Sequence, residues 1–337
     1  MATLTVLMPV YNAGQFLTAA IDSILNQTFT DFEFLIIDDC STDNSVNIIK
    51  SYTDPRIRFY KNEINVGISP TLNRGIELAS TELIARMDSD DISYRERLQK
   101  QYDFIRANPD GALFSCGVRV IGPENQFIRQ DNFKSEYYYY NLTFICWIYH
   151  PTIIFRKKAV QDVGMYAVRY SEDFELFWQL SRKYKIYNLQ ETLMDYRVTD
   201  QSLHQVLKKK EYDEAQKQQL LRNFRYYAGE KYTIPEDYMD CLQHNFDPLL
   251  KEQSVRKVVA CIYELEFLTQ CILTKENINR DPAAIERAAF FKRRFIILFF
   301  WEHLPAIKGI LLLTRLKEIV IIKRLIKDAI KRFLKIT

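Results

Sequence analysis

Short apolar segments alternate with helix-like segments over residues 4–121, and this alternation constrains the fold more than any other feature of the chain. Stretches such as LTVLMPV, FEFLIIDD and ELIARMD have the composition of strands, and a segment with helical periodicity follows each of them. This order predicts βαβ units and a parallel sheet. The strands are apolar at consecutive positions, as expected where helices cover both faces. We therefore predict an α/β fold, with an open, mostly parallel sheet and helices on both faces.

The pattern changes further along the chain. It loosens into turns and mixed segments over 122–200, and beyond about residue 203 it is nearly all helical. The segment 203–227 has the periodicity of one long amphipathic helix. We therefore predict two domains, an α/β domain over 1–202 and an all-helical C-terminal region over 203–337.

Cysteine usage and hydropathy indicate a cytoplasmic protein. The six cysteines show no CxxC or Cys/His metal spacing, which is typical of reduced, mostly buried thiols. A strand pattern that begins at Leu4 leaves no room for a signal peptide. Strongly apolar runs such as FIILFFW (295–301) are far shorter than the roughly 20 residues that span a bilayer. The net charge of +3 is too small by itself to indicate nucleic-acid binding.

Polar residues follow three of the predicted strands. In an open parallel sheet, ligands bind beyond the carboxyl ends of the strands. The residues predicted to meet at this edge are Pro9, Val10, Tyr11 and Asn12 near the end of the first strand, Asp38 and Asp39 at the end of the second, and Asp88, Ser89, Asp90 and Asp91, which end or follow the fourth.

The crowded carboxylates of DSDD (88–91) admit two interpretations. Two unit charges about 4 Å apart repel by roughly 1 kcal/mol in bulk water and about 4 kcal/mol near a protein surface. The segment is either a solvated turn or a site where a divalent cation bridges the carboxylates to a diphosphate. Oxygen ligands alone favour Mg²⁺ or Mn²⁺. The sequence has no GxxxxGK[ST] loop and no GxGxxG after the first strand, which argues against a P-loop or a dinucleotide site.

Several stretches, in this order, resemble the family 2 glycosyltransferases with the A-type glycosyltransferase fold. They cover about residues 3–200 and read TVLMPVYNAGQFLTAAIDSILNQTFTDFEFLIIDDCSTDNS, NEINVGISPTLNRGIELA, MDSDD, HPTIIFRKKAVQDVGMY and SEDFELFWQL. The resemblance implies an inverting transfer of a sugar from a nucleotide diphosphate donor, assisted by Mn²⁺ or Mg²⁺. The domain 1–202 would then be the nucleotide-sugar-binding catalytic domain of a bacterial surface-polysaccharide enzyme.

The resemblance also implies roles for single residues around the nucleotide. Pro9 and Tyr11, with Val10 between them, would form the wall of the base pocket. Asp39 resembles the carboxylate that hydrogen-bonds uracil, which favours UDP as the carrier, and Asn65 would lie near the nucleotide.

Further roles fall on the acidic segments. Asp88 and Asp90 match the DxD motif: Asp90 would bind the metal, and Asp88 would contact the ribose or a water on the metal, with Ser89 between them beside the nucleotide. Asp91 would either join this site or cap the following helix. Asp173 matches the catalytic base, with Glu172 beside it. The alternative for this acidic pair is a first helical turn stabilised by the helix dipole.

The chain departs from the family pattern at two places. Leu72 stands where family members often carry an arginine near the diphosphate, and Arg74 is displaced by two positions. Tyr196-Arg197 is followed by Val198-Thr199, so the histidine of a YRxH motif is missing, and His204 lies too far along to replace it. The chain also lacks QxxRW, which argues against a processive polymer synthase.

Two aromatic residues are candidates for the acceptor side. His150 begins the HPTIIF segment, and Trp178 lies at helical spacing from Phe174. A packed, hydrogen-bonded histidine and a core tryptophan are the alternative interpretations of the same residues.

The last part of the chain, 290–337, contains twelve Lys or Arg against three acidic residues, a local charge of +9. Basic helices with bulky apolar faces lie flat on anionic membranes. We therefore expect peripheral binding at the inner face of the cytoplasmic membrane and a saccharide acceptor that is lipid-linked. An ordinary helical cap with a solvated basic face is the alternative.

Nucleic acid is not an expected partner. A nucleotide-sugar-binding protein without catalysis, or a membrane-associated scaffold, is the alternative function.

Overall fold

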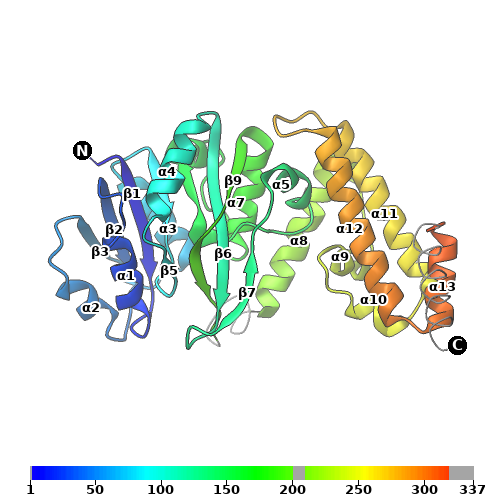
Figure 1. Ribbon diagram of the computed structural model, residues 1–337, viewed down its shortest axis with the longest axis horizontal. Helices are drawn as coiled ribbons and strands as arrows, with labels where there is room; N and C mark the ends of the chain where they lie inside the picture. Colours follow the sequence, from blue (N-terminus) through cyan, green and yellow to red (C-terminus); the bar gives the residue numbers. More distant parts are fainter. Residues whose placement is uncertain (1, 200–208, 319–337) are drawn as a thin grey trace, which may run out of the picture. The chain divides into compact units, whose positions relative to one another are not determined.

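The computed structural model describes residues 2–199 and 209–318 and divides into two compact units (Figure 1). Where described, unit 1 comprises 1–142, 146–216 and 277–279, and unit 2 comprises 143–145, 217–276 and 280–337. The boundary predicted between 202 and 203 lies outside the described residues.

Unit 1 is built on one mixed sheet. Its strands are β1 (Leu4–Val10), β2 (Phe32–Asp38), β3 (Ile57–Lys61), β4 (Leu83–Arg86), β5 (Ile92–Ser93), β6 (Gly111–Ile121), β7 (Phe127–Asp131), β8 (Ile154–Arg156) and β9 (Lys185–Arg197). The order across the sheet is β3-β2-β1-β4-β8-β6-β9-β5, and β7 pairs with β6. Six strands, β1, β2, β3, β4, β6 and β9, run in one direction, and β5, β7 and β8 run in the other. The predicted open, mostly parallel sheet is therefore confirmed.

Helices connect the strands of unit 1. They are α1 (Leu17–Leu25), α2 (Ser45–Ser51), α3 (Ile68–Leu78), α4 (Arg97–Ala107), α5 (Tyr138–Asn141), α6 (Lys157–Asp162), α7 (Glu172–Lys183) and α8 (Lys209–Ala228), with short 3₁₀ helices at Ser135–Tyr137 and His150–Thr152. The start of the predicted 203–227 helix lies outside the described residues, and its described part is α8.

Helices lie against both faces of the parallel half of the sheet (Figure 1). Val6 and Met8 of β1 belong to the same buried cluster as Ile21 of α1. Leu7, between them in sequence, points to the opposite face, since side chains alternate along a strand. There it meets Gly75 of α3, where a Cβ atom would come within 2.3 Å of the Leu7 side chain. Glycine at this position therefore lets α3 pack directly on β1.

Unit 2 is helical, as the sequence predicts. It contains α9 (Glu236–Leu242), α10 (Asp247–Glu252), α11 (Val255–Thr274), α12 (Pro282–His303) and α13 (Ala306–Arg315), together with the second part of α8. Asp281 caps α12 by accepting a hydrogen bond from the backbone N–H of Ala284 at 3.1 Å, and Pro282 occupies the first turn. Within the described part of the chain, the helices are too short or too polar for any of them to cross a bilayer.

Candidate active site

The loops that follow β1 and β2 are bound to each other at the carboxyl edge of the sheet. Asn12 has a positive φ of 49°; its backbone N–H donates to Ser41 Oγ at 2.9 Å and its Oδ1 accepts from the Thr42 N–H at 2.8 Å. Immediately before these contacts, Pro9 and Val10 are buried, whereas Tyr11 is 52% exposed. Of the predicted base-pocket residues, only the Tyr11 ring is therefore open to a ligand from the solvent side.

Asp39 and Asn65, two of the predicted nucleotide-binding residues, lie together. Asn65 Nδ2 donates to the Asp39 backbone carbonyl at 3.3 Å. The Asp39 carboxylate is buried and accepts from the N–H groups of Val66, at 3.0 Å, and Gly67, at 2.8 Å. It also accepts from Asn62 Nδ2 at 2.7 Å. Asp39 thus fixes the loop before α3 and presents that loop at the edge of the sheet.

Asp88, Asp90 and Asp91 form a carboxylate cluster after β4, with one oxygen of each within 4.8 Å of the others. Burial, and then the negative charge of Asp88, raise the pKa of Asp90 to about 7. Burial and the neighbouring Asp90 raise the pKa of Asp91 well above its ordinary value. Asp91 Oδ2 is buried and makes no hydrogen bond to the described residues. Three closely placed carboxylates are a set of hard oxygen ligands that fits a divalent cation such as Mg²⁺ or Mn²⁺.

Asp91 does not cap the following helix, because the N-cap position of α4 is Glu96. Instead, Asp91 Oδ1 accepts a hydrogen bond from the backbone N–H of Arg197 at 2.7 Å. The Arg197 side chain donates to the Asp90 carbonyl at 2.8 Å and to the carbonyls of Gly122, at 3.1 Å, and Pro123, at 3.0 Å. Arg197 therefore holds the loop that carries the carboxylate cluster.

A second arginine, Arg86, contacts the carboxylate cluster through an ion pair. Arg86 is 3% exposed and forms an ion pair with Asp88. The buried Arg97 donates to the Arg86 carbonyl at 3.1 Å and to the Pro151 carbonyl at 2.7 Å, and so fixes the end of β4. The sequence predicts no role for Arg86 or Arg97, and it marks Arg197 only as part of the incomplete YRxH motif. The signal for Arg86 is a charged residue inside an otherwise apolar strand, LIARM.

The second acidic group lies at the start of α7. Ser171, at the N-cap, has a positive φ of 57°. Glu172 is buried, and burial and the charge of Asp173 raise its pKa to about 8. Asp173 is half-buried, and its Oδ1 accepts from the Phe174 N–H at 2.7 Å. The charges of Arg86 and Asp88 also act on the Glu172 carboxyl, Arg86 lowering and Asp88 raising its pKa. The start of α7 and the carboxylate cluster therefore share one electrostatic environment.

His150 and Trp178, the candidates for the acceptor side, are both packed in the protein. His150 Nε2 lies 2.7 Å from Tyr166 Oη, and burial and then Arg86 hold the pKa of the imidazole well below its ordinary value. Trp178 is 3% exposed, and the Arg182 guanidinium carbon lies 4.2 Å from the centre of one of its rings. These surroundings fit the alternative interpretations, in which His150 is a packed, hydrogen-bonded histidine and Trp178 is a core residue.

The first departure from the family pattern, at Leu72, has a structural counterpart. Leu72 is fully buried in α3, so that position is part of the core. Arg74 donates to the Lys61 carbonyl at 3.2 Å and to Asn62 Oδ1, and it therefore ties α3 to the end of β3. His204 lies outside the described residues.

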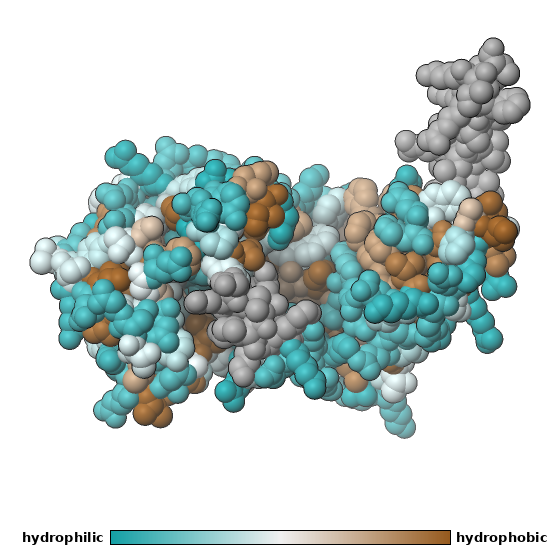
Figure 2. Space-filling model, turned by 90° about the horizontal axis from the view of Figure 1, so that it is seen from below, coloured by the Kyte–Doolittle hydropathy of each residue, from teal (hydrophilic) through white to brown (hydrophobic). Residues whose placement is uncertain are grey.

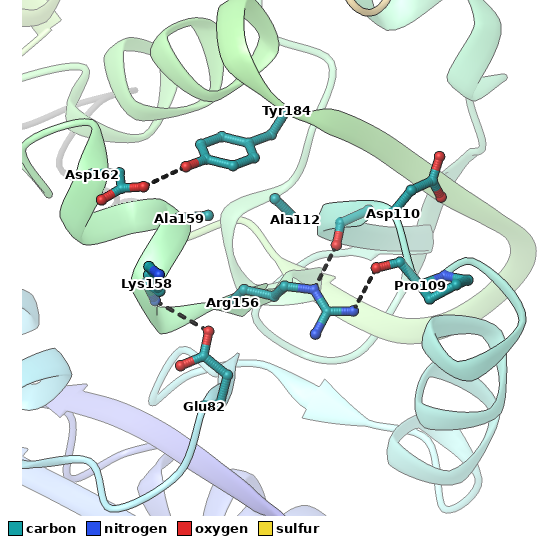
Figure 3. A pocket seen from close by; sticks show the side chains of 10 residues that line it. Glu82, Pro109, Asp110, Ala112, Arg156, Lys158, Ala159, Asp162 and Tyr184 are labelled. Carbon is teal, nitrogen blue, oxygen red and sulfur yellow. Dashed lines mark hydrogen bonds between the residues drawn. The ribbon is translucent and has the colours of Figure 1, made fainter.

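A pocket of about 380 Å³ lies at the other end of the sheet, beside the starts of β4 and β6 (Figure 3). Its polar side chains bind the protein itself. Arg156 donates to the carbonyls of Gly111, at 2.8 Å, and Pro109, at 3.1 Å, and Tyr184 Oη donates to Asp162 at 2.6 Å (Figure 3). Because ligands of open α/β sheets bind at the carboxyl ends of the strands, the edge with the carboxylate cluster is the candidate active site.

Residues 5–164 match the family model for glycosyl transferase family 2. The O-antigen biosynthesis glycosyltransferase WbnJ of Escherichia coli is 29% identical over 270 residues, which cover 77% of this chain and 94% of that protein. An uncharacterized glycosyltransferase of Methanocaldococcus jannaschii is 31% identical over 228 residues, covering 62% of this chain and 76% of that protein.

Two solved structures have the same fold. One is the S. aureus protein TarS in complex with UDP-GlcNAc, with a TM-score of 0.54 at 17% identity over 87% of this chain and 90% of that one. The other is the mannosyltransferase PcManGT from Pyrobaculum calidifontis in complex with GDP-Man and Mn²⁺, with a TM-score of 0.51 at 15% identity over 91% of this chain and 86% of that one. Both likenesses agree with the α/β fold of the A-type glycosyltransferases. Because the family model matches residues 5–164 and the relatives are matched over most of their length, this chain belongs to glycosyl transferase family 2.

Proposed function

We propose that this protein is a metal-dependent, inverting glycosyltransferase that moves a sugar from a nucleotide diphosphate donor to a hydroxyl of a saccharide acceptor. One observation carries the proposal: the carboxylate cluster and the separate acidic pair Glu172-Asp173 lie in one electrostatic environment at the carboxyl edge of the sheet. A single-step displacement needs these two groups, one for the donor's diphosphate and one for the acceptor's proton.

Asp90 and Asp88 are the residues that would hold the metal, either Mn²⁺ or Mg²⁺. A cation bound there neutralises negative charge on the leaving diphosphate. The protein prepares the site by itself, since Arg197 fixes the backbone at Asp90 and Arg86 pairs with Asp88. The first contact holds the backbone of the loop and the second holds the Asp88 carboxylate before the donor binds, which lowers the entropy cost of assembling the site.

Asp173 is the proposed catalytic base. In an inverting transfer the acceptor hydroxyl attacks the sugar carbon from the face opposite the departing diphosphate and loses its proton to a carboxylate. The hydrogen bond from the Phe174 N–H to Asp173 Oδ1 orients that carboxylate. Glu172 is buried beside it, and with a pKa of about 8 it is mostly protonated at neutral pH. The adjacent acids would therefore have different roles.

The donor is proposed to be a UDP-sugar. The exposed ring of Tyr11 and the loop that Asp39 holds lie at the same edge of the sheet and would enclose the nucleoside. UDP is favoured because Asp39 resembles the uracil partner of the family. The structural neighbours are named as complexes with UDP-GlcNAc and with GDP-Man, so the fold accommodates both carriers.

The acceptor is proposed to be a lipid-linked saccharide in surface polysaccharide synthesis, as the name of WbnJ suggests for a relative. An enzyme with such an acceptor works at the inner face of the cytoplasmic membrane. The charge of +9 over residues 290–337 supports peripheral binding there, since each basic residue near an anionic surface contributes about 1 kcal/mol.

Calorimetric titration of UDP, GDP and dTDP, with Mn²⁺ and with EDTA, tests the proposal. We expect one nucleotide to bind with Mn²⁺ and not with EDTA, and Asp90→Ala to abolish that binding. Asp103→Ala is the matched control, because Asp103 is an exposed acid on α4. No nucleotide binding in the presence of Mn²⁺ would contradict the role given to the carboxylate cluster. Binding without turnover of any donor would favour the non-catalytic alternative.

A further inference from the structure

The helix α12 exposes large apolar side chains along one face. Phe290 is 56% exposed, Phe291 55% and Phe295 49%. Positions 290, 294, 298 and 301 are three or four residues apart. Leu298 and Trp301 therefore lie on the same face of the helix as Phe290. The other side of the helix is buried through Ile285, Ala288, Ile296 and Phe300. We call Phe290, Phe291, Arg294, Phe295 and Leu298 the outer strip of α12.

The next helix, α13, has an exposed apolar face of its own. Ile307 is 83% exposed, Ile310 57% and Leu311 42%. The opposite side of α13 is buried through Gly309, Leu312 and Leu313.

The two exposed faces adjoin each other at the end of α12. A Cβ atom on Gly309 would lie 2.9 Å from the Trp301 ring, so the inner side of α13 rests on Trp301. Because Trp301 lies in line with the outer strip, α13 covers the far end of that face of α12. Ile307, Ile310 and Leu311 lie on the side of α13 away from Trp301. In Figure 2, hydrophobic residues lie at the surface of the part of unit 2 that holds α13.

Basic residues accompany these apolar ones. Apart from Arg293, those at exposed or half-exposed positions of α12 and α13 are Arg287, Arg294, Lys308 and Arg315, and the acids at such positions on the same helices are Glu286 and Glu302. Arg293 does not belong to the surface set, since it pairs with Glu266 at 2.7 Å and with Glu318. Lys292 is buried. The face is therefore both apolar and cationic.

We propose that this face, the outer strip of α12 with Ile307, Ile310 and Leu311 of α13, inserts into the headgroup region of an anionic phospholipid bilayer. Apolar side chains flanked by Arg and Lys are what an interfacial helix presents to lipid. The inference deepens the proposed function, and it rests on that function for the lipid-linked acceptor.

A second copy of the chain is a poorer occupant. In a twofold dimer the same patch meets itself, so Arg294 and Arg315 of one protomer would face the like-charged patch of the other. An anionic lipid surface has the complementary charge and accepts the apolar residues as well.

Flotation of the full-length protein with vesicles tests the inference. We expect binding to vesicles that contain about 30% anionic phosphatidylglycerol and little binding to pure phosphatidylcholine. The variant F290S/F291S/I307S/I310S should bind at least about tenfold more weakly, because four inserted apolar side chains are lost. Arg294→Gln with Arg315→Gln should weaken binding and its dependence on salt. Phe127→Ser on β7 is the control, since Phe127 is 63% exposed in unit 1.

Three results would overturn the inference: no binding of the wild type to anionic vesicles, equal binding by the serine variant, or a dimer that the serine variant dissociates while vesicle binding is unchanged. Circular dichroism and thermal unfolding verify that the variants fold. Calorimetric UDP binding with Mn²⁺, without lipid, should be the same in the serine variant and the wild type. If the wild type does not bind a nucleotide, the result counts against the proposed function. If it binds the nucleotide but not the anionic vesicles, the result counts only against the membrane-inserting face of α12 and α13.

Discussion

Asp91 accepts a hydrogen bond at 2.7 Å from the backbone N–H of Arg197, 106 positions further along the chain. Just beside this contact, β5 pairs with β9, Ile92 opposite Asp195. The segment that carries the carboxylate cluster is therefore held by β9, the last strand along the chain, and its geometry depends on the side chain and the backbone of Arg197.

Arg197→Ala should weaken Mn²⁺-dependent nucleotide binding by about tenfold or more, because the carbonyls of Asp90, Gly122 and Pro123 lose their common donor. Calorimetry with Mn²⁺ measures the effect. Arg129→Ala removes an ion pair with Asp131 on exposed β7 and should leave nucleotide binding unchanged. Equal affinities for the wild type and Arg197→Ala would mean that the loop keeps its shape without this support.

Arg86→Met should lower the free energy of unfolding by about 3–5 kcal/mol in EDTA, because it leaves the carboxylate cluster without its buried counter-charge. Mn²⁺ should then raise the melting temperature of the variant more than that of the wild type, since the cation offsets the same repulsion. Thermal unfolding with EDTA and with Mn²⁺ gives both values. A shift with Mn²⁺ that is no larger in the variant would contradict the role given to Arg86.

Asp173→Asn should lower kcat by about 10²–10⁴-fold and leave the affinity for UDP unchanged, because it removes the base without touching the metal site. Glu172→Gln is the matched variant. Burial and Asp173 raise the pKa of Glu172 to about 8, so at neutral pH the amide replaces a group that is already mostly uncharged. Its kcat should fall far less. Steady-state transfer assays on both variants decide between the two acids, and the reverse order would exchange their roles.

Lys292 should make the stability of the protein depend on pH. Burial lowers its pKa from the ordinary 10.5 to about 7; its ammonium donates to the Leu242 carbonyl at 2.6 Å and lies 3.2 Å from His244 Nε2. Between pH 7 and 10.5 the unfolded chain binds more protons at this residue than the folded chain does. The contribution of Lys292 to the free energy of unfolding therefore rises with pH over that range.

Lys292→Met removes this dependence. It should stabilise the protein most below about pH 7, on the order of a few kcal/mol, and the gain over the wild type should shrink as the pH rises. Urea unfolding of both proteins at several pH values measures the difference. A constant difference across the range would show that folding does not lower the pKa of Lys292.

The local pattern of the sequence was sufficient to predict the alternating strands and helices of the first unit and its mostly parallel sheet. Periodicity of two and of 3.6 residues depends only on near neighbours, so strands such as Leu4–Val10 and helices such as Leu17–Leu25 could be read directly. The family resemblance added candidate roles for Asp88, Asp90 and Asp173. The direction of β8, which runs against β4 and β6, could not be read in this way, because it depends on pairing between distant segments.

The sequence by itself determined the α/β order of the elements, the helical nature of the C-terminal region and the acidic segments at the carboxyl edge. Only the tertiary structure decided which groups support those acids. The sequence marks Arg86 only as a charge inside an apolar strand and Arg197 only as part of an incomplete motif, and neither signal shows what the side chain contacts. Asp91 binds a backbone N–H of β9 instead of capping α4. The physical reason is that burial and long-range hydrogen bonds arise only when strands far apart in sequence are brought together, and these contacts set the charge and geometry of the site.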